Sequence, residues 1–181
     1  MATSVYIDNN VWDFLLERGL DLAVELPSEE FCVCITREAE FEIPPIPSDK
    51  SELKAFINET IARCGILTES YFGFYDDSLP QKEQRMRGFD GGRFITREEE
   101  AFMNQQRSPL SGKKSTTGLY KDEADIPLAA RSFHSVVLSL DSKTGPINTA
   151  YRQGGKVVFL ADFDINNLTL SDFIKADIHS K

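Results

Sequence analysis

Four short apolar runs place the strongest constraint on how this 181-residue chain folds. Each run is continuous rather than alternating, and they lie at residues 5–7, 31–35, 136–140 and 157–160. Strands of this kind are typical of parallel sheets, because helices cover both faces of such a sheet. The sequence between the runs has apolar residues at helical spacing, so strands and helices alternate along the chain. The pattern therefore predicts an α/β protein with a central, mainly parallel sheet.

Capping signals mark where the helices between these strands begin and end. Two capping boxes are expected, Asp49 with Glu52 and Thr96 with Glu99, and Gly65 is expected to end the first of these two helices. Residues 66–75 are compatible with either a strand or a continued helix. The other expected helices cover residues 9–20 (capped by Asn9 or Asn10), 36–42 (capped by Thr36), 125–134, 146–153 and 169–176. We expect one domain over residues 1–181, carrying an inserted, flexible and locally basic segment at about 76–118.

Charge and cysteine usage narrow the class of protein. The net charge is −9, but residues 81–118 hold eight Lys or Arg against five Asp or Glu, so the other 143 residues sum to −12. An acidic protein repels nucleic acid at long range, unless part of that charge forms a cation site. Three cysteines without metal-binding spacing fit a reducing cytoplasm, and neither a membrane span nor a signal peptide is expected. No nucleophile elbow, phosphate-binding glycine loop or dinucleotide fingerprint is present.

Acidic residues follow the apolar runs at positions suited to metal chemistry. Asp8 and Asp141 directly follow two of the predicted strands, Asp125 starts a predicted helix, and Glu40 lies just beyond a third strand. In open parallel sheets, ligands collect at the carboxyl ends of the strands. Carboxylates gathered there are stable only when they are protonated or neutralised by a cation, and hard oxygen ligands suit Mg²⁺ or Mn²⁺. These ions assist phosphodiester hydrolysis, so the four acids form a candidate catalytic centre.

Three segments resemble PIN domains. Val5-Tyr-Ile-Asp8-Asn-Asn10-Val is similar to the family's opening strand and Asp, and Asp125-Ile-Pro-Leu-Ala-Ala130 looks like its Asp-x-x-aliphatic-Ala-Ala helix start. Val136-Val-Leu-Ser139-Leu-Asp141 resembles the strand that follows. The resemblance covers about residues 4–42 and 121–162. It implies a Rossmann-like three-layer sandwich and a nuclease that cleaves single-stranded RNA with Mg²⁺ or Mn²⁺.

The resemblance also implies roles for individual residues. Asp8, Asp125 and Asp141 would bind metal, and the second acid maps to Glu40, with Glu38 and Glu42 as alternatives. Two of these acids also have a specific structural interpretation. Asp125 could cap its helix, and Asp141 could start a turn. We expect Ser139, together with Asn9 or Asn10, to orient the carboxylates. Asp122 and Glu123 could contribute a ligand, but a solvated position is expected for both. The candidate RNA contacts are Lys113, Lys114 and Arg93, with Arg85 and Arg87 in the same segment.

The biological setting stays open at this point. Small PIN proteins are commonly toxins of toxin–antitoxin pairs, while other members process RNA. Expected partners are therefore an RNA substrate, an antitoxin or other protein, or a second copy in a homodimer. The alternatives are a non-catalytic PIN-like module that binds protein or RNA, and a nuclease that acts on structured DNA.

Overall fold

A six-stranded, all-parallel sheet forms the centre of the molecule. The computed structural model describes residues 2–89, 91–106, 116–165 and 167–179. Along the sheet the strand order is β4-β3-β2-β1-β5-β6, and every neighbouring pair is parallel. The strands are β1 (Thr3–Ile7), β2 (Phe31–Thr36), β3 (Leu67–Tyr71), β4 (Gly92–Arg93), β5 (Val136–Ser139) and β6 (Val157–Phe159).

The four predicted strands are confirmed, and their continuous apolar character has the expected cause. Successive residues of a strand point to opposite faces of the sheet. In β1, Val5 and Ile7 pack into one apolar core, whereas Tyr6 packs into a second core on the other face. A strand with helices on both faces therefore buries consecutive side chains, and the predicted α/β fold is observed.

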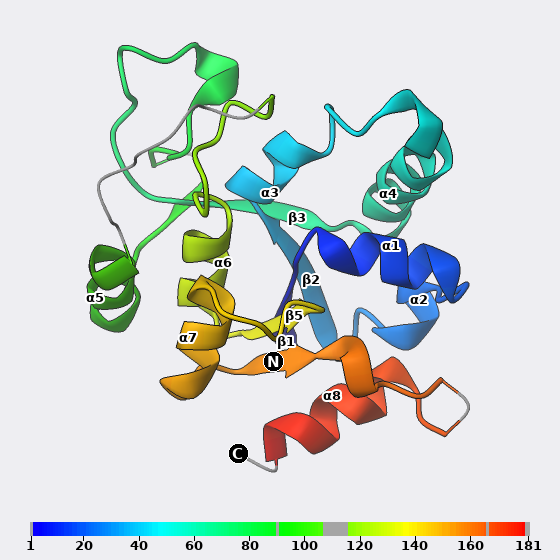
Figure 1. Ribbon diagram of the computed structural model, residues 1–181. Helices are drawn as coiled ribbons and strands as arrows, with labels where there is room; N and C mark the ends of the chain where they lie inside the picture. Colours follow the sequence, from blue (N-terminus) through cyan, green and yellow to red (C-terminus); the bar gives the residue numbers. More distant parts are fainter. Residues whose placement is uncertain (1, 90, 107–115, 166, 180–181) are drawn as a thin grey trace.

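Helices cover both faces of the sheet (Figure 1). One side carries α1, α2, α4 and α8, whose apolar side chains join the larger core, and α5, α6 and α7 contribute to the smaller one. The helices are α1 (Asn10–Glu17), α2 (Leu22–Glu25), α3 (Arg37–Glu42), α4 (Ser51–Cys64), α5 (Arg97–Gln106), α6 (Asp125–Arg131), α7 (Pro146–Arg152) and α8 (Leu170–His179). Three short 3₁₀ turns complete the fold: η1 (Ser48–Lys50), η2 (Gln81–Glu83) and η3 (Leu160–Asp162).

Three of the predicted helix caps are confirmed. The hydroxyl of Thr36 accepts a hydrogen bond from the backbone N–H of Ala39 at 3.1 Å. Thr96 and Glu99 form the expected reciprocal capping box, with bonds of 3.3 and 2.9 Å. Gly65 ends α4 in the left-handed conformation, at φ 61°.

Two predicted caps are wrong. The 3₁₀ turn η1 shifts the start of α4, so Lys50 occupies the N-cap position without a side-chain bond, and Asp49 forms no capping box. Asn9 is the N-cap residue of α1, but its side chain bonds elsewhere and makes no cap. The side chains of Asn9 and Asp49 instead line the same cavity.

The segment from residue 66 to 93 contains two strands. Residues 67–71 form β3, which settles the choice between strand and helix, and the polar stretch beyond it contributes η2 and the two-residue strand β4. A Cβ atom on Gly92 would lie 2.3 Å from the carbonyl oxygen of Arg87 and 2.6 Å from the Cα of Phe72. Glycine at this position therefore lets the backbone approach closely enough to add β4 to the sheet.

Over the described ranges, every helix is too short or too polar to cross a membrane.

Candidate active site

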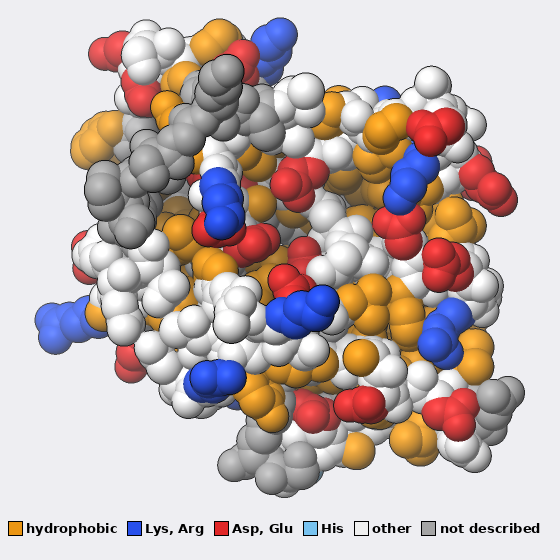
Figure 2. All heavy atoms as spheres, in the orientation of Figure 1, with side chains coloured by type: hydrophobic (Ala, Val, Ile, Leu, Met, Phe, Trp, Pro, Cys, Tyr) orange, Lys and Arg blue, Asp and Glu red, His pale blue; other side chains and the backbone are white. Residues whose placement is uncertain are grey.

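The strand order has its reversal at β1. The chain moves from β1 through β2 to β3 on one side of the sheet, and later places β5 on the other side of β1. Ligands bind at such a switch point, beyond the carboxyl ends of the two central strands. Asp8 directly follows β1, and Ser139 is the last residue of β5. Figure 2 shows Asp and Glu side chains gathered around the hollow at the centre of this face.

Asp8 is held by a network of hydrogen bonds between these two strand ends. Its Oδ2 accepts bonds from the hydroxyl of Ser139 at 2.6 Å and from the side-chain amide of Asn10 at 2.7 Å. Ser139, which is fully buried, also accepts a bond from the backbone N–H of Asp141 at 3.0 Å. Burial raises the pKa of Asp8, although the bonds from Ser139, Asn9 and Asn10 oppose this rise. Ser139 therefore links Asp8 to the backbone of Asp141.

Asp125 reaches the same place from the first turn of α6. The N-cap residue of this helix is Ala124, so capping does not account for Asp125. Burial raises its pKa to about 7, and the negative charges of four acids contribute to the rise: Asp8, Asp122, Glu42 and Asp141. Asp125 thus lies within electrostatic reach of carboxylates contributed by four separate segments of the chain.

Glu42, at the end of α3, is the fourth member of this group. Its carboxylate accepts a hydrogen bond from the side-chain amide of Asn9, which also donates to the carbonyl oxygen of Ala39 at 3.2 Å. Burial raises the pKa of Glu42, the bond from Asn9 lowers it, and the charge of Asp8 raises it. The amide of Asn9 therefore holds the carboxylate of Glu42 in place.

Glu40 points to a different part of the surface. It forms an ion pair with Arg37, whose guanidinium also bonds the carbonyl oxygen of Gln84 at 3.1 Å. Consecutive helical residues are about 100° apart, so Glu40 and Glu42 lie on opposite sides of α3. Helical spacing predicts that Glu38 and Glu42 share one face of the helix and that Glu40 lies on the other. It does not show which of these faces is turned toward the switch point. Glu38 is buried beside Arg131, Glu123 and Arg85.

The structure thus brings together Asp8, Asp125 and Asp141 with Glu42, which we call the acidic cluster. Its oxygen atoms are the donor type that Mg²⁺ and Mn²⁺ prefer, and the mutual repulsion of the carboxylates would be relieved by a cation. In the described part of the chain, however, no three His, Cys, Asp or Glu side chains lie close enough together to hold a metal ion as they stand. The cluster therefore fits a divalent cation in chemistry and charge, and its side chains would have to move inward to bind one.

Asp122 is exposed, as expected, but it lies close enough to Asp125 to act on it electrostatically. Its charge is one of those that raise the pKa of Asp125. Its backbone has φ 60°, a conformation uncommon for residues other than glycine but better tolerated by Asp and Asn. The short interval from Asp122 to Asp125, at the start of a predicted helix, is the sequence feature that indicates their proximity.

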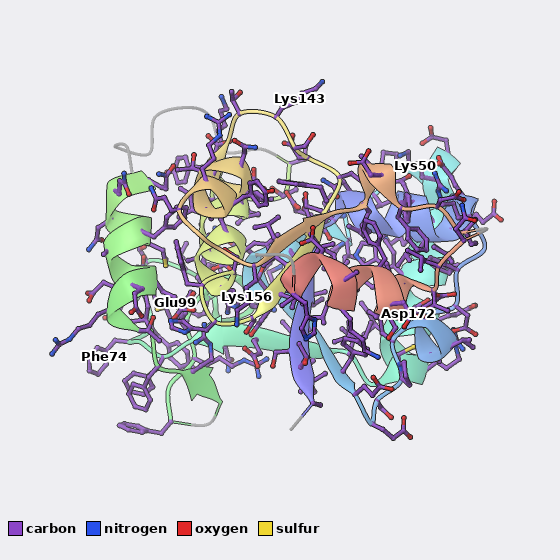
Figure 3. All side chains as sticks on the ribbon, turned by 90° about the horizontal axis from the view of Figure 1, so that it is seen from below. Lys50, Phe74, Glu99, Lys143, Lys156 and Asp172 are labelled. Atoms are coloured by element: carbon purple, nitrogen blue, oxygen red, sulfur yellow. The ribbon has the colours of Figure 1, made fainter. Side chains whose placement is uncertain are left out.

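The predicted RNA contacts lie away from these carboxylates or outside the described residues. Lys113 and Lys114 belong to residues 107–115, which are not described. Arg93 lies on β4, where it pairs with Glu99 and, at 3.7 Å, with Glu69. Arg85 pairs with Glu123 at 2.9 Å. Lys143, on the loop after Asp141, projects outward from the molecule (Figure 3).

No model of a known protein family matches the sequence, and neither does any curated protein sequence. Among solved structures, a domain of a functionally unknown protein from Methanocaldococcus jannaschii DSM 2661 is similar, with 18% identity and a TM-score of 0.40. The match covers 90% of this chain and 94% of that chain. The fold is therefore defined here by its own strand order and layers: a parallel six-stranded α/β sheet flanked by helices.

Proposed function

We propose that this protein is a PIN-like nuclease that hydrolyses phosphodiester bonds of single-stranded RNA with the help of Mg²⁺ or Mn²⁺. One observation carries the proposal: four carboxylates from four segments gather at the switch point of a parallel sheet, and their charges act on one another. Burial is the largest cause of the raised pKa values, and repulsion between the carboxylates adds to it. Acids with perturbed pKa values gathered in one place are typical of functional sites.

Each acid would contribute to holding the cation and the substrate. Asp8 is fixed by Ser139 and Asn10 and offers its other carboxylate oxygen to the site. Glu42 is oriented by Asn9, and Asp125, whose pKa is about 7, would be ionised when a cation is bound beside it. When bound there, a divalent ion would polarise the scissile phosphate and lower the pKa of an attacking water.

The overall charge of the chain favours a mechanism that depends on a cation. A protein of net charge −9 repels the phosphates of RNA, so substrate would approach the acidic cluster only after it is neutralised. The basic residues of segment 81–118 would then supply phosphate contacts, with Lys113 and Lys114 as the candidates in that segment. RNA processing and a toxin–antitoxin role both remain compatible with this chemistry.

Cleavage of a fluorescently labelled single-stranded RNA, with Mn²⁺ and with EDTA, tests the proposal. Asp8→Asn and Asp141→Asn should each lower the cleavage rate by about a thousandfold, because each removes a ligand charge but keeps the shape of the side chain. Asp172→Asn is the matched control, since Asp172 is an exposed acid on α8 and is not a member of the acidic cluster (Figure 3). Cleavage that survives in the Asp8→Asn, Asp141→Asn double variant would exclude the proposal, as would cleavage unaffected by EDTA.

A cluster of exposed aromatic residues favours a second candidate, a non-catalytic PIN-like module that binds a protein such as an antitoxin. Phe74 and Phe89 are each 93% exposed and Phe94 is 70% exposed. The ring of Phe72 lies 4.8 Å from those of Phe89 and Phe94, so these rings form a continuous surface. Exposed apolar patches of this kind commonly mark interaction sites. Figure 3 shows Phe74 pointing away from the body of the molecule.

Calorimetric titration with Mn²⁺ separates the two candidates. A nuclease should bind Mn²⁺ with measurable heat, and that heat should be lost in Asp8→Asn. An absence of metal binding at millimolar Mn²⁺ would favour the non-catalytic module.

A further inference from the structure

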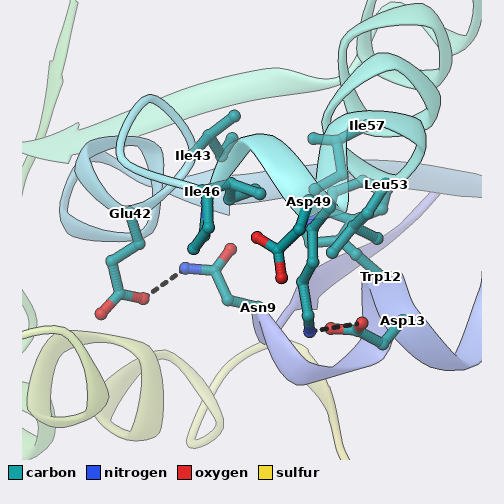
Figure 4. A pocket seen from close by; sticks show the side chains of 11 residues that line it. Asn9, Trp12, Asp13, Glu42, Ile43, Ile46, Asp49, Leu53 and Ile57 are labelled. Atoms are coloured by element: carbon teal, nitrogen blue, oxygen red, sulfur yellow. Dashed lines mark hydrogen bonds and ion pairs between the residues drawn. The ribbon is translucent and has the colours of Figure 1, made fainter.

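A cavity of about 380 Å³ opens directly beside the acidic cluster. It lies between α1, the end of α3, η1 and α4, and Asn9 and Glu42 belong both to its wall and to the site described above (Figure 4). Its volume is within the range of about 300–1,000 Å³ that is usual for small-molecule pockets. A group bound in this cavity would therefore sit next to a phosphate held by the carboxylates.

The walls of the cavity are mainly apolar. They can pack against the faces of a flat ring, because aliphatic side chains supply most of the lining. The apolar lining residues are Trp12, Ile43, Ile46, Pro47, Leu53 and Ile57.

Hydrogen-bond acceptors are placed at one end of this apolar space. The side-chain oxygen of Asn9 is buried and has no hydrogen-bond partner among the described residues, since the amide nitrogen makes the bonds to Ala39 and Glu42. Asp49 also lines the cavity and forms no ion pair with another described residue. Figure 4 shows the carboxylate of Asp49 and the amide of Asn9 turned toward one another.

The neighbouring cation does not satisfy these acceptors. Lys50 lines the same cavity, but its ammonium group pairs with Asp13 at 3.1 Å. A buried acceptor that lacks a donor costs free energy, so a ligand that supplies donors gains by binding here. The remaining polar group is the indole N–H of Trp12, which also has no partner among the described residues.

We infer that this cavity is a base-binding subsite for the RNA strand and that it prefers guanine. Guanine carries two adjacent donors on one edge, the ring N1–H and the exocyclic amino group, which match the Asn9 oxygen and the Asp49 carboxylate. Adenine and cytosine each offer only an amino group beside a ring acceptor, and uracil places a carbonyl acceptor on both sides of its single N–H. The two acceptors at this end of the cavity disfavour bases that present acceptors to them. The inference rests on the proposed nuclease function, because that function supplies the RNA.

Binding can be measured without catalysis, because Trp12 is the single tryptophan of the chain and lines the cavity. Tryptophan fluorescence is recorded during titration with guanosine 5′-monophosphate and with uridine 5′-monophosphate, in EDTA and with correction for absorbance. The two probes share the same phosphate, so a difference between them reports the base. We expect saturable quenching by the guanine nucleotide, with an affinity at least about tenfold higher than that for the uracil nucleotide.

The variant Asp49→Asn isolates the acceptor. Asp49 is exposed, so the fold should persist, while the preference for guanine should fall to about threefold or less because a donor replaces one acceptor. Asp172→Asn should keep the full preference. Equal binding of the two nucleotides to the wild type, a preference for another base, or an unchanged preference in Asp49→Asn would each overturn the inference.

Cleavage then distinguishes this inference from the proposed function. If guanine binds selectively but RNA is never cut, the subsite stands and the nuclease proposal fails. If Mn²⁺-dependent cleavage occurs without any preference for sites next to guanine, the nuclease stands and the subsite fails. When both hold, cleavage beside guanine should exceed cleavage beside uracil, and Asp49→Asn should reduce that ratio.

Discussion

Two buried acids, Glu99 and Asp125, differ in the charges that surround them. Glu99 is fully buried, and burial alone would raise its pKa, but hydrogen bonds from Arg93 and Thr96 hold that pKa below its usual value. Asp125 is also largely buried, but its neighbours are other acids, and its pKa rises to about 7. The first carboxylate has partners of opposite charge, and the second has neighbours of like charge.

This difference separates an acid that stabilises the fold from the acids of the proposed catalytic site. A buried carboxylate with a positive partner and helix-cap bonds contributes to stability. Carboxylates that repel one another reduce stability, and chains retain such arrangements where function needs them. The comparison therefore predicts opposite responses when charge is removed from the two regions.

The largest expected effect concerns the choice between two acids of α3. Glu42→Gln should lower the rate of RNA cleavage by about a hundredfold or more, because it removes charge from the acidic cluster. Glu40→Gln should change the rate by less than about threefold, because Glu40 pairs with Arg37 on the opposite side of the helix. The measurement is the same labelled-RNA assay with Mn²⁺. A result in the reverse order would restore Glu40 as the second acid.

A second prediction concerns the compensated acid. Glu99→Gln removes the nearest negative charge from Arg93 and leaves only Glu69, at 3.7 Å, to pair with it. We expect a loss of about 2 kcal/mol in the free energy of unfolding, which corresponds to a fall of about 4–8 °C in Tm for a chain of this size. Thermal unfolding followed by circular dichroism measures this change. The control is Glu100→Gln, which alters an exposed acid of the same helix and should leave Tm within about 1 °C.

The third prediction has the opposite sign. Asp125→Asn should raise Tm by about 2–4 °C at pH 8 in EDTA, since the amide removes a repelled charge but keeps the size of the side chain. The same variant should lower RNA cleavage. If Asp125→Asn lowers Tm instead, the repulsion within the acidic cluster does not limit stability.

The smallest expected effect is the change with pH in the Tm gain of Asp125→Asn. The pKa of Asp125 is about 7 in the folded protein, against an ordinary value of 3.8 in the unfolded chain. As pH rises from about 4 to 7, Asp125 ionises in the unfolded chain before it ionises in the folded protein. The free energy of unfolding of the wild type therefore falls over this pH range and is constant above it. The Tm advantage of Asp125→Asn should therefore shrink toward zero as pH falls to about 4. Saturating Mn²⁺ at pH 8 should also reduce it, and an advantage that is constant with pH would contradict this origin.

Much of the fold and part of the site were predictable because their signals are local. Apolar runs identify β1, β2, β5 and β6 without reference to the rest of the chain, and the parallel arrangement follows from their continuity. Asp8 and Asp141 were predicted to share one edge because both follow strand ends. Ser139 and Asn9 were predicted to orient carboxylates. In the structure Ser139 donates a hydrogen bond to Asp8, and Asn9 donates one to Glu42.

The rest depends on contacts that a linear pattern does not contain. The rotation of α3 about its axis decides between Glu40 and Glu42, and that rotation is set by packing against β2 and β3. Strand β4 has only two residues, and it forms because Gly92 allows a close approach to Phe72. The sequence indicates that Arg93 is a basic residue of a loop, and only the fold places Glu99 and Glu69 beside it.

The link between Ser139 and Asp8 spans 131 residues of sequence, so the order of synthesis has a consequence. A ribosome-bound chain that has released only its first hundred residues can pair β1 with β2 and β3, but it lacks the strand that completes the central pair. Closing so long an intervening segment is slow compared with forming local helices. A nascent chain at that stage carries Asp8 and Glu42 but lacks Asp125 and Asp141, so the acidic cluster, which the proposed nuclease function requires, is complete only after translation has passed β5.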